Sequence, residues 1–148
     1  MTPFEGAIGF RTDLGSVSGA AETLPNGVVT NRGQEWTLSS DGLSDPRLQG
    51  TVSNMWNWDM FKTGQPHTIE VGGFHIENDG GAWQVRPVVQ ILFPDGAYSG
   101  WTGIFDGESG YAGLTAIAEV QEGGSGFTLR GVVIEGEVPP APESLSAE

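Results

Sequence analysis

Residues 83–105, WQVRPVVQILFPDGAYSGWTGIF, decide the fold of this chain. Two runs rich in β-branched and aromatic residues flank Phe93-Pro94-Asp95-Gly96. These four residues fit a type I turn, because Pro presets φ at the second position and Gly accepts the left-handed conformation at the fourth. The resulting loop of three residues pairs Phe93 with Ala97. The stretch therefore predicts an antiparallel hairpin with a defined register.

This register sorts the side chains of the hairpin onto two faces. Counting outward from the turn, Ile91, Val89 and Val85 lie opposite Ser99, Trp101 and Phe105; with Trp83, they make one face almost wholly apolar. The other face is mixed and holds Gln84, Arg86, Val88, Gln90, Leu92, Tyr98, Gly100, Thr102 and Ile104. An apolar interior indicates a packed or lipophilic barrel, whereas a mixed interior indicates a reaction chamber.

Strand signals recur along the rest of the chain, and 24 glycines and nine prolines punctuate them. No helical periodicity persists over about 11 residues without a Gly or Pro. The expected strands are 4–11, 16–24, 28–38, 48–61, 67–77, 82–93, 97–106, 112–120 and 127–135, with one of the first three irregular. A second hairpin is expected to turn at Glu122-Gly123-Gly124-Ser125-Gly126. The pattern predicts an all-β fold: a single closed antiparallel barrel of about eight strands, since closure removes exposed edges.

The length and composition indicate one domain. A chain of 148 residues is long enough to bury a core without disulfides, and it contains no cysteine. We expect a barrel domain over residues 1–137 and a flexible, Pro-rich acidic tail over residues 138–148. The missing cysteines also exclude thiolate nucleophiles and Cys-based zinc sites.

The charge balance excludes several classes of partner. There are 19 acidic residues and six basic ones, a formal net charge of −13, so the surface repels phosphate backbones and anionic lipids. We therefore expect no nucleic-acid partner, and no membrane insertion, because no apolar run approaches the roughly 18 residues needed. The first residues, Met1–Glu5, carry no basic segment followed by an apolar run, which predicts no signal peptide. A cytoplasmic location is favoured over secretion with the leader removed.

The titratable residues give a short list of candidates. His67 and His75 would lie roughly 26 Å apart on a regular strand at about 3.3 Å per residue, so no metal site is expected. His75 is read either as a structural residue or as an acid–base group lining the barrel. Arg86 lies mid-strand, either on the solvated face or in a polar cavity with Gln90 and Tyr98. In the cavity it needs an acidic partner such as Glu70 or Glu119, because an unpaired buried charge is costly.

Tryptophan supplies the other candidates. Trp56, Trp58, Trp83 and Trp101 are either core residues or the walls of a pocket, where flat rings bind apolar ligands at small entropic cost.

A family resemblance lies in Gly100-Trp101-Thr102-Gly103-Ile104-Phe105-Asp106-Gly107-Glu108-Ser109-Gly110-Tyr111-Ala112-Gly113-Leu114. This stretch resembles the Gly-x-Gly-x-Phe-x-Gly-x-x-Gly segment of allene oxide cyclase and dirigent-like β-barrels. Its later part, Gly110–Thr115, is similar to small bacterial barrel cyclases that close spiro-linked rings in polyketides. Residues 44–51 are similar to a segment of bacterial relatives of the same superfamily. The resemblance covers roughly residues 45–136 and implies the barrel fold and a cyclase activity.

Three functions follow as alternatives. The first is a cofactor-independent cyclase or isomerase that holds a largely apolar small molecule in the barrel. For it we expect Arg86, Glu119 and Tyr98 as catalytic residues. The ligand-binding residues expected are Trp56, Trp58, Trp83, Trp101, His75 and Gln90. The second is a non-catalytic carrier of a lipophilic molecule, as in lipocalins. The third is a packed barrel that acts in a homo-oligomer.

Overall fold

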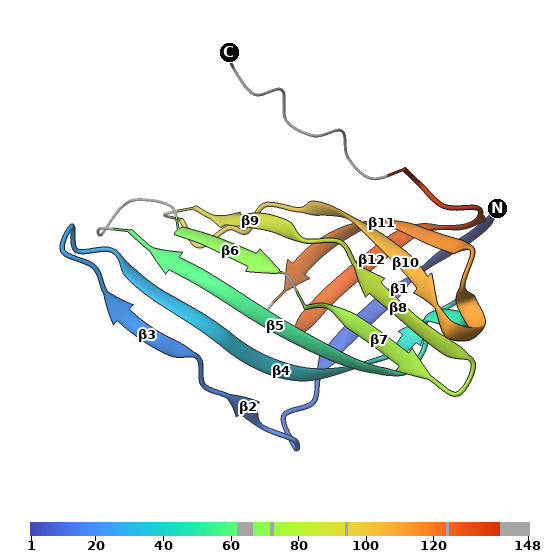
Figure 1. Cartoon of the computed structure of the whole chain (residues 1–148), viewed down its shortest axis with the longest axis horizontal. Coiled ribbons are helices and arrows are strands. Elements are labelled where there is room, and N and C mark those ends of the chain that lie inside the picture. The colour runs from blue at the N-terminus through green and yellow to red at the C-terminus, as the bar shows by residue number, and fades with distance from the viewer. Residues whose placement is uncertain (62–66, 72, 94, 124, 140–148) are drawn as a thin grey trace, which may run out of the picture.

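Twelve strands and two short 3₁₀ turns make up the described part of the chain (Figure 1). The computed structural model describes residues 1–61, 67–71, 73–93, 95–123 and 125–139. The strands are β1 (Thr2–Phe10), β2 (Ser16–Val17), β3 (Ala20–Thr23), β4 (Val29–Leu43), β5 (Thr51–Met60), β6 (His67–Val71), β7 (His75–Asn78), β8 (Gly81–Val85), β9 (Val88–Leu92), β10 (Trp101–Glu108), β11 (Leu114–Gly123) and β12 (Gly126–Glu135). The 3₁₀ turns are η1 (Pro46–Leu48) and η2 (Ser109–Tyr111).

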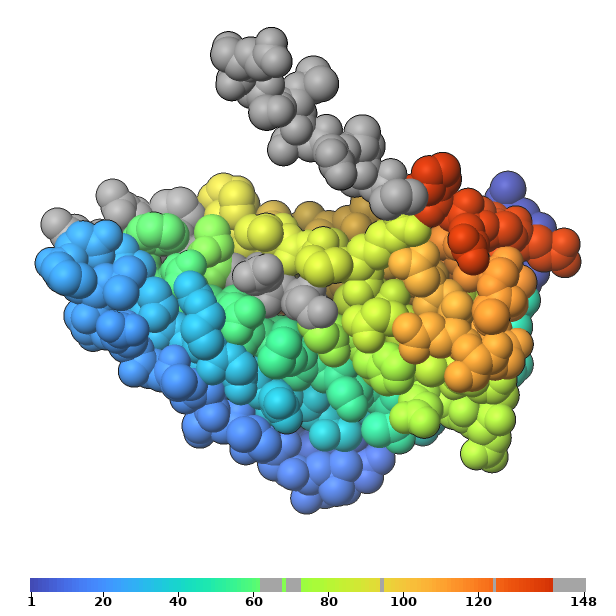
Figure 2. All heavy atoms as spheres, viewed as in Figure 1, coloured from blue at the N-terminus to red at the C-terminus, as the bar shows by residue number. Residues whose placement is uncertain are grey.

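The strands close into an eight-stranded antiparallel barrel, as the sequence predicts. Around the ring the order is β4, β1, β12, β11, β10, β8, β7 and β5, and pairing of β5 with β4 closes it. β6 continues the line of β7 along β5, and β9 continues that of β8 along β6. β2 and β3 lie outside the ring and pair only with β4. The irregular early strand is thus the segment expected over 16–24. In Figure 2, viewed as Figure 1 is, the blue residues of β2 and β3 lie along the lower edge of the molecule.

The hairpin register predicted from the sequence is confirmed at both of its ends. Near the turn, the Phe93 N–H donates to the Ala97 carbonyl at 2.8 Å, and the Gly96 N–H donates to the Phe93 carbonyl at 2.9 Å. Far from the turn, Val85 still faces Phe105. Pro94 lies outside the described residues.

The prediction that a single face of the hairpin lines the interior along its whole length is wrong. Val85 is buried at 1% exposure, but beyond Pro87 the pattern inverts: Val89 is 63% exposed and Gln90 only 1%. Proline has no N–H for a sheet ladder, and β8 ends just before the Arg86-Pro87 pair while β9 begins just after it. This break shifts the inward alternation by one residue. On the β8–β9 side, the apolar residues therefore point inward before the break and the mixed ones after it, whereas Trp101 and Phe105 of β10 stay buried throughout.

The same break leaves a seam in the barrel wall. β9 and β10 are held together at the turn, where the Ser99 N–H donates to the Ile91 carbonyl at 2.8 Å. They meet again where the Arg86 N–H donates to the Ile104 carbonyl at 2.9 Å. Between these points, no backbone hydrogen bond joins residues 87–90 to residues 100–103, all of which are described. We call this stretch the β9–β10 seam.

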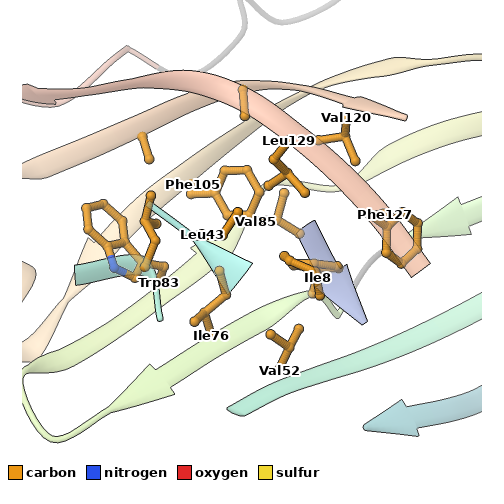
Figure 3. Close-up of a cluster of buried hydrophobic side chains, with 14 of the residues drawn as sticks. Ile8, Leu43, Val52, Ile76, Trp83, Val85, Phe105, Val120, Phe127 and Leu129 are labelled. Atoms are coloured by element: carbon orange, nitrogen blue, oxygen red, sulfur yellow. The ribbon is translucent and has the colours of Figure 1, made fainter. Parts of the chain in front are cut away.

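One end of the barrel, here the capped end, is closed by η1 and η2. Trp83 is fully buried there, stacks on Tyr111 with ring centroids 5.2 Å apart, and donates from Nε1 to the Arg47 carbonyl at 2.7 Å. Asn78 donates to the carbonyls of Arg47 and Gln49, which fastens η1 to β7. Figure 3 shows the aliphatic and aromatic side chains that fill the adjoining interior.

A layer of aromatic rings spans the barrel between this core and the opposite end. The rings touch in the order Phe10, Trp36, Trp56, Phe127, Phe74 and Trp101, with centroids 5.5 to 6.4 Å apart. Beyond the layer lie the turns of the β9–β10 and β11–β12 hairpins, and we call this the hairpin end. A side chain at Gly103 would collide with the Trp101 and Phe105 rings at 2.7 Å, which accounts for the glycine there.

Candidate functional site

Polar side chains from β9, from β11 and from the segment that precedes β10 meet inside the hairpin end. Glu122 lies on β11 in phase with Ala118 and Val120, both of which point into the core. Gln90 lies inward on β9, and its Nε2 donates to the Ser99 carbonyl at 2.9 Å. Tyr98, bridged to β9 at the end of the seam, packs against the core.

Burial changes the acidity of this group. Burial raises the pKa of Glu122 to about 7, although Gln90 beside the carboxyl opposes the rise. The pKa of Tyr98 is raised by burial and then by the negative charge of Glu122. A carboxyl that titrates near neutrality is present in both forms and can accept and return a proton.

Several buried polar atoms around the aromatic layer have no hydrogen-bond partner among the described residues. They include the indole Nε1 atoms of Trp36, Trp56 and Trp101, both amide atoms of Asn54, and Oε2 of Glu122. Asn54 faces Trp36 across the β4–β5 ladder and is only 1% exposed. Most buried polar atoms in proteins are paired, and leaving one unpaired costs about 1 to 3 kcal/mol. These atoms come from β4, β5, β10 and β11 around the aromatic layer, which makes this part of the barrel the candidate site.

This arrangement suits a ligand with oxygen acceptors. Indole N–H groups can donate to a carbonyl oxygen, and the Glu122 carboxyl can exchange a proton with a neighbouring carbon. The surrounding rings supply an apolar wall. No cofactor is required for such chemistry.

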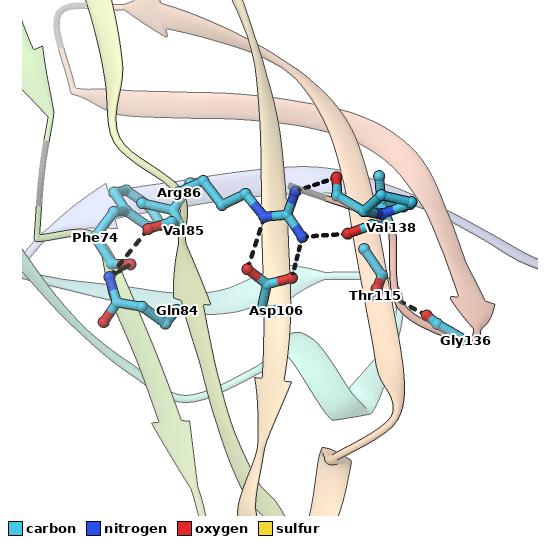
Figure 4. Close-up of polar contacts among 9 residues, drawn as sticks. Phe74, Gln84, Val85, Arg86, Asp106, Thr115, Gly136 and Val138 are labelled. Carbon is cyan, nitrogen blue, oxygen red and sulfur yellow. Dashed lines mark hydrogen bonds and ion pairs between the residues drawn. The ribbon is translucent and has the colours of Figure 1, made fainter. Parts of the chain in front are cut away.

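Arg86 lies on the outside of the barrel, not in the cavity considered from the sequence. It forms a two-pronged ion pair with Asp106 at 2.8 and 2.9 Å (Figure 4). It also donates to the carbonyls of Val138 and Pro139 at 2.5 and 3.0 Å. Its acidic partner is therefore Asp106 and not Glu119, and the side chain of Glu70 lies outside the described part. The two described residues of the expected flexible tail are fastened by this arginine, and residues 140–148 lie outside the described part.

Glu119 also faces solvent. It forms an ion pair with Arg130 at 2.9 Å on the outer face of β11 and β12, and the two side chains are 54% and 77% exposed. Neither of the two charged residues expected to be catalytic reaches the interior. Tyr98 and Gln90 do lie there.

The four tryptophans expected to bind ligand separate into three groups. Trp83 belongs to the packed core at the capped end. Trp58 is half-buried, and its Nε1 donates to Gln34 Oε1 at 3.1 Å. Trp56 and Trp101, 9% and 7% exposed, lie in the aromatic layer, and their indole N–H groups have no partner among the described residues.

His75 does not line the barrel. Its neighbours Phe74 and Ile76 point into the core, and its Nδ1 shares a hydrogen bond of 3.2 Å with Gln84 Oε1 on the outer face. The side chain of His67 lies outside the described part. Among the described residues, no three His, Asp or Glu side chains are grouped to hold a metal ion.

Two residues of the site, Glu122 and Asn54, are not among the site residues predicted from the sequence, although the strand alternation carries a signal for each. Glu122 is expected in a turn, yet the alternation of Ala116, Ala118 and Val120 continues to it. Asn54 lies in phase with Val52 and Trp56 on the long strand of residues 48–61, so its inward position had a signal as well.

Comparison of the chain with protein-family models, curated proteins and solved structures finds no match. In the part of the chain that the structure describes, no helix has the length and apolar character to cross a membrane.

Proposed function

We propose that this protein is a cofactor-independent cyclase or isomerase that acts on a mainly apolar small molecule at the hairpin end. One observation carries the proposal: Glu122, a carboxyl whose pKa is raised to about 7, lies at an inward position beside the aromatic layer. The likeness of residues 100–114 to barrel cyclases agrees with it.

The proposed reaction is a proton transfer. The Glu122 carboxylate removes a proton from the carbon next to a substrate carbonyl, and the electron pair of the C–H bond moves onto that oxygen. Indole N–H donors from Trp56 or Trp101 stabilise the resulting enolate. Return of the proton to a different carbon completes an isomerisation.

Ring closure uses the same groups. The enolate carbon attacks a second carbonyl carbon of the same molecule, a carbon–carbon bond forms, and Glu122 gives its proton to the new alkoxide. The aromatic layer holds the chain folded so that the two carbons stay close. Arg86 and Glu119 take no part, because both lie outside the barrel.

A non-catalytic carrier is the second candidate. The contacts between Phe10, Trp36 and Trp56 favour it, since rings bind an apolar ligand whatever the role of Glu122. The homo-oligomer stays a prediction, to be tested by light scattering. The contact surface between its subunits would include Val89, Ile91 and Phe93, which are exposed on or just after β9.

Deuterium exchange tests the proposed activity. The full-length protein is incubated in heavy water with a panel of enolisable ketones and diketones, and exchange at the α-carbon is followed by NMR. We expect catalysed exchange that falls by about 100-fold or more in Glu122→Gln, the range typical of losing a general base. The matched control is Glu119→Gln on the outer face of the same strand, which keeps full activity.

Equal exchange by wild type and Glu122→Gln with every compound would contradict the proposed activity. Tight binding of such compounds without any exchange would establish the carrier instead.

A further inference from the structure

We infer that the ligand is an electrically neutral, flat ring compound with carbonyl oxygens, and not a carboxylate or phosphate. This inference rests on the proposed function for the location of the site. It goes further by naming the ligand class, and three features of the hairpin end carry it.

The first feature is the kind of hydrogen bond that is missing. The indole N–H of tryptophan donates but cannot accept. Trp36, Trp56 and Trp101 each bury this donor without a partner among the described residues. A ligand that satisfies them must bring acceptors, and carbonyl oxygens are acceptors without charge.

The second feature is the place of the positive charges. All five arginines form ion pairs with carboxylates. The pairs are Arg11–Asp13, Arg32–Asp59, Arg47–Asp45, Arg86–Asp106 and Arg130–Glu119. The arginine side chains are 26% to 77% exposed, so these charges lie toward solvent. The base that completes the six, Lys62, lies outside the described residues.

Among the described residues, the hairpin-end interior therefore holds one acid and no base. An anion placed beside Glu122 would be buried without a positive partner, which is strongly unfavourable. A neutral ligand avoids this cost, and it can also accept a hydrogen bond from the protonated form of Glu122.

The third feature is the orientation of the rings. Trp56 meets Phe10 and Phe127 edge to face, at interplanar angles of 81° and 86°. Phe74 and Trp101 meet at 76°. Crossed rings present faces and edges to a neighbour that is itself flat, so a planar ring packs among them better than a branched chain.

The route inward is consistent with these features. The unpartnered atoms expose almost no surface, so the ligand must part the side chains above them. The seam at residues 87–90 and 100–103 is the part of the β9–β10 boundary that no backbone hydrogen bond holds, and it borders Trp101.

Three probes with one ring skeleton test the inference on the full-length protein: fluorenone, fluorene and fluorenone carboxylate. Dissociation constants are measured by titration at pH 7 and 0.15 M salt. We expect fluorenone to bind about 10-fold or more tighter than fluorene, which lacks the oxygen, and than the carboxylate, which adds the charge.

Tryptophan variants identify the donors. Trp56→Phe and Trp101→Phe keep a ring but remove the N–H, so each should weaken fluorenone binding by about 2- to 10-fold and leave fluorene binding nearly unchanged. Trp58→Phe is the matched control, because its N–H is already bonded to Gln34.

Tightest binding by the carboxylate, equal binding of fluorenone and fluorene, or no binding of any probe would overturn the inference. The proposed activity fails separately: fluorenone preference without Glu122-dependent deuterium exchange leaves the ligand class standing and removes the reaction.

Discussion

Glu119 and Glu122 are three residues apart on β11 and have opposite surroundings. Glu119 points to solvent and pairs with Arg130, whereas Glu122 points inward, where burial raises its pKa to about 7. The side of the strand thus decides the chemistry, because alternate residues of a strand face opposite sides of the sheet. An acid on the inner side that meets no base keeps its proton to a higher pH.

The pKa of Glu122 predicts how stability depends on pH. The folded-state value, about 7, lies above the unfolded value of about 4.3, so the folded state binds the proton more tightly. The resulting stabilisation is fully present below pH about 4 and is lost as the pH rises through 7. After allowance for partial exposure of the carboxyl, we expect the loss to be about 1 to 2 kcal/mol.

Urea denaturation from pH 4 to pH 8 measures this loss. Glu122→Gln should show a smaller decline in the free energy of unfolding than wild type, and Glu119→Gln should decline as wild type does. Parallel curves for wild type and Glu122→Gln would show that Glu122 has an ordinary pKa.

Two tryptophan substitutions separate paired from unpaired indole groups. Trp83→Phe removes a 2.7 Å hydrogen bond to the Arg47 carbonyl, whereas Trp101→Phe removes an N–H with no partner among the described residues. Both leave a similar gap in a buried core, so the difference reports the hydrogen bond. We expect Trp83→Phe to lower the free energy of unfolding by about 1 to 2 kcal/mol more than Trp101→Phe. Equal losses would contradict the assignment of a hydrogen bond to the Trp83 N–H and of none, among the described residues, to the Trp101 N–H.

At the level of single residues, the sequence predicts some of the site and misses its centre. Gln90 and Tyr98 lie inside, as expected of a mixed face turned inward. Arg86 and His75 lie outside, because the phase of a strand cannot be deduced from residue types alone when neighbouring positions are both polar and apolar. Glu122 was missed because its glycine-rich neighbours resemble a turn.

The β8–β9 element shows why register is easier to predict than phase. The Phe93–Gly96 turn fixes which residues of the two strands face each other, and this holds through to Val85 and Phe105. The Arg86-Pro87 break interrupts the pairing at the seam but leaves the register the same on both sides of it, and it rotates the strand so that Val89 turns outward and Gln90 inward. A proline within a strand predicts a break, but it does not predict which side chains point into the barrel after the break.

Hydrogen exchange tests the seam that this break creates. In an antiparallel strand, the backbone N–H groups of alternate residues point to the same side. The Ile91 N–H donates to Ser99 Oγ at 2.9 Å, so the Val89 N–H, two residues earlier on β9, faces β10 across the seam. We expect this amide to exchange far faster than those of Ala118 and Val120, which lie within the β10, β11 and β12 ladders. The measurement is amide exchange followed by NMR. Protection of Val89 equal to that of Val120 would show that the seam is closed in solution.

The whole barrel is the feature that the sequence predicts best. Turn residues divide the chain into strands, and eight strands close because closure leaves no long exposed edge. What composition does not reveal is how the interior divides along its length. The capped end is filled by core side chains, and the hairpin end gathers the polar ones. That division depends on the phase of every strand at once.

Closure of the barrel is also what gives Glu122 its environment, since it brings the β9–β10 hairpin with Gln90 and Tyr98 and the rings of the aromatic layer around β11. The most direct test is an NMR titration of the Glu122 side-chain carboxyl carbon, in the folded protein and in the protein unfolded by urea. We predict a midpoint near 7 in the folded protein and near 4.3 in the unfolded one. A folded-state midpoint close to the unfolded value would contradict the account of a proton-transfer site inside the barrel.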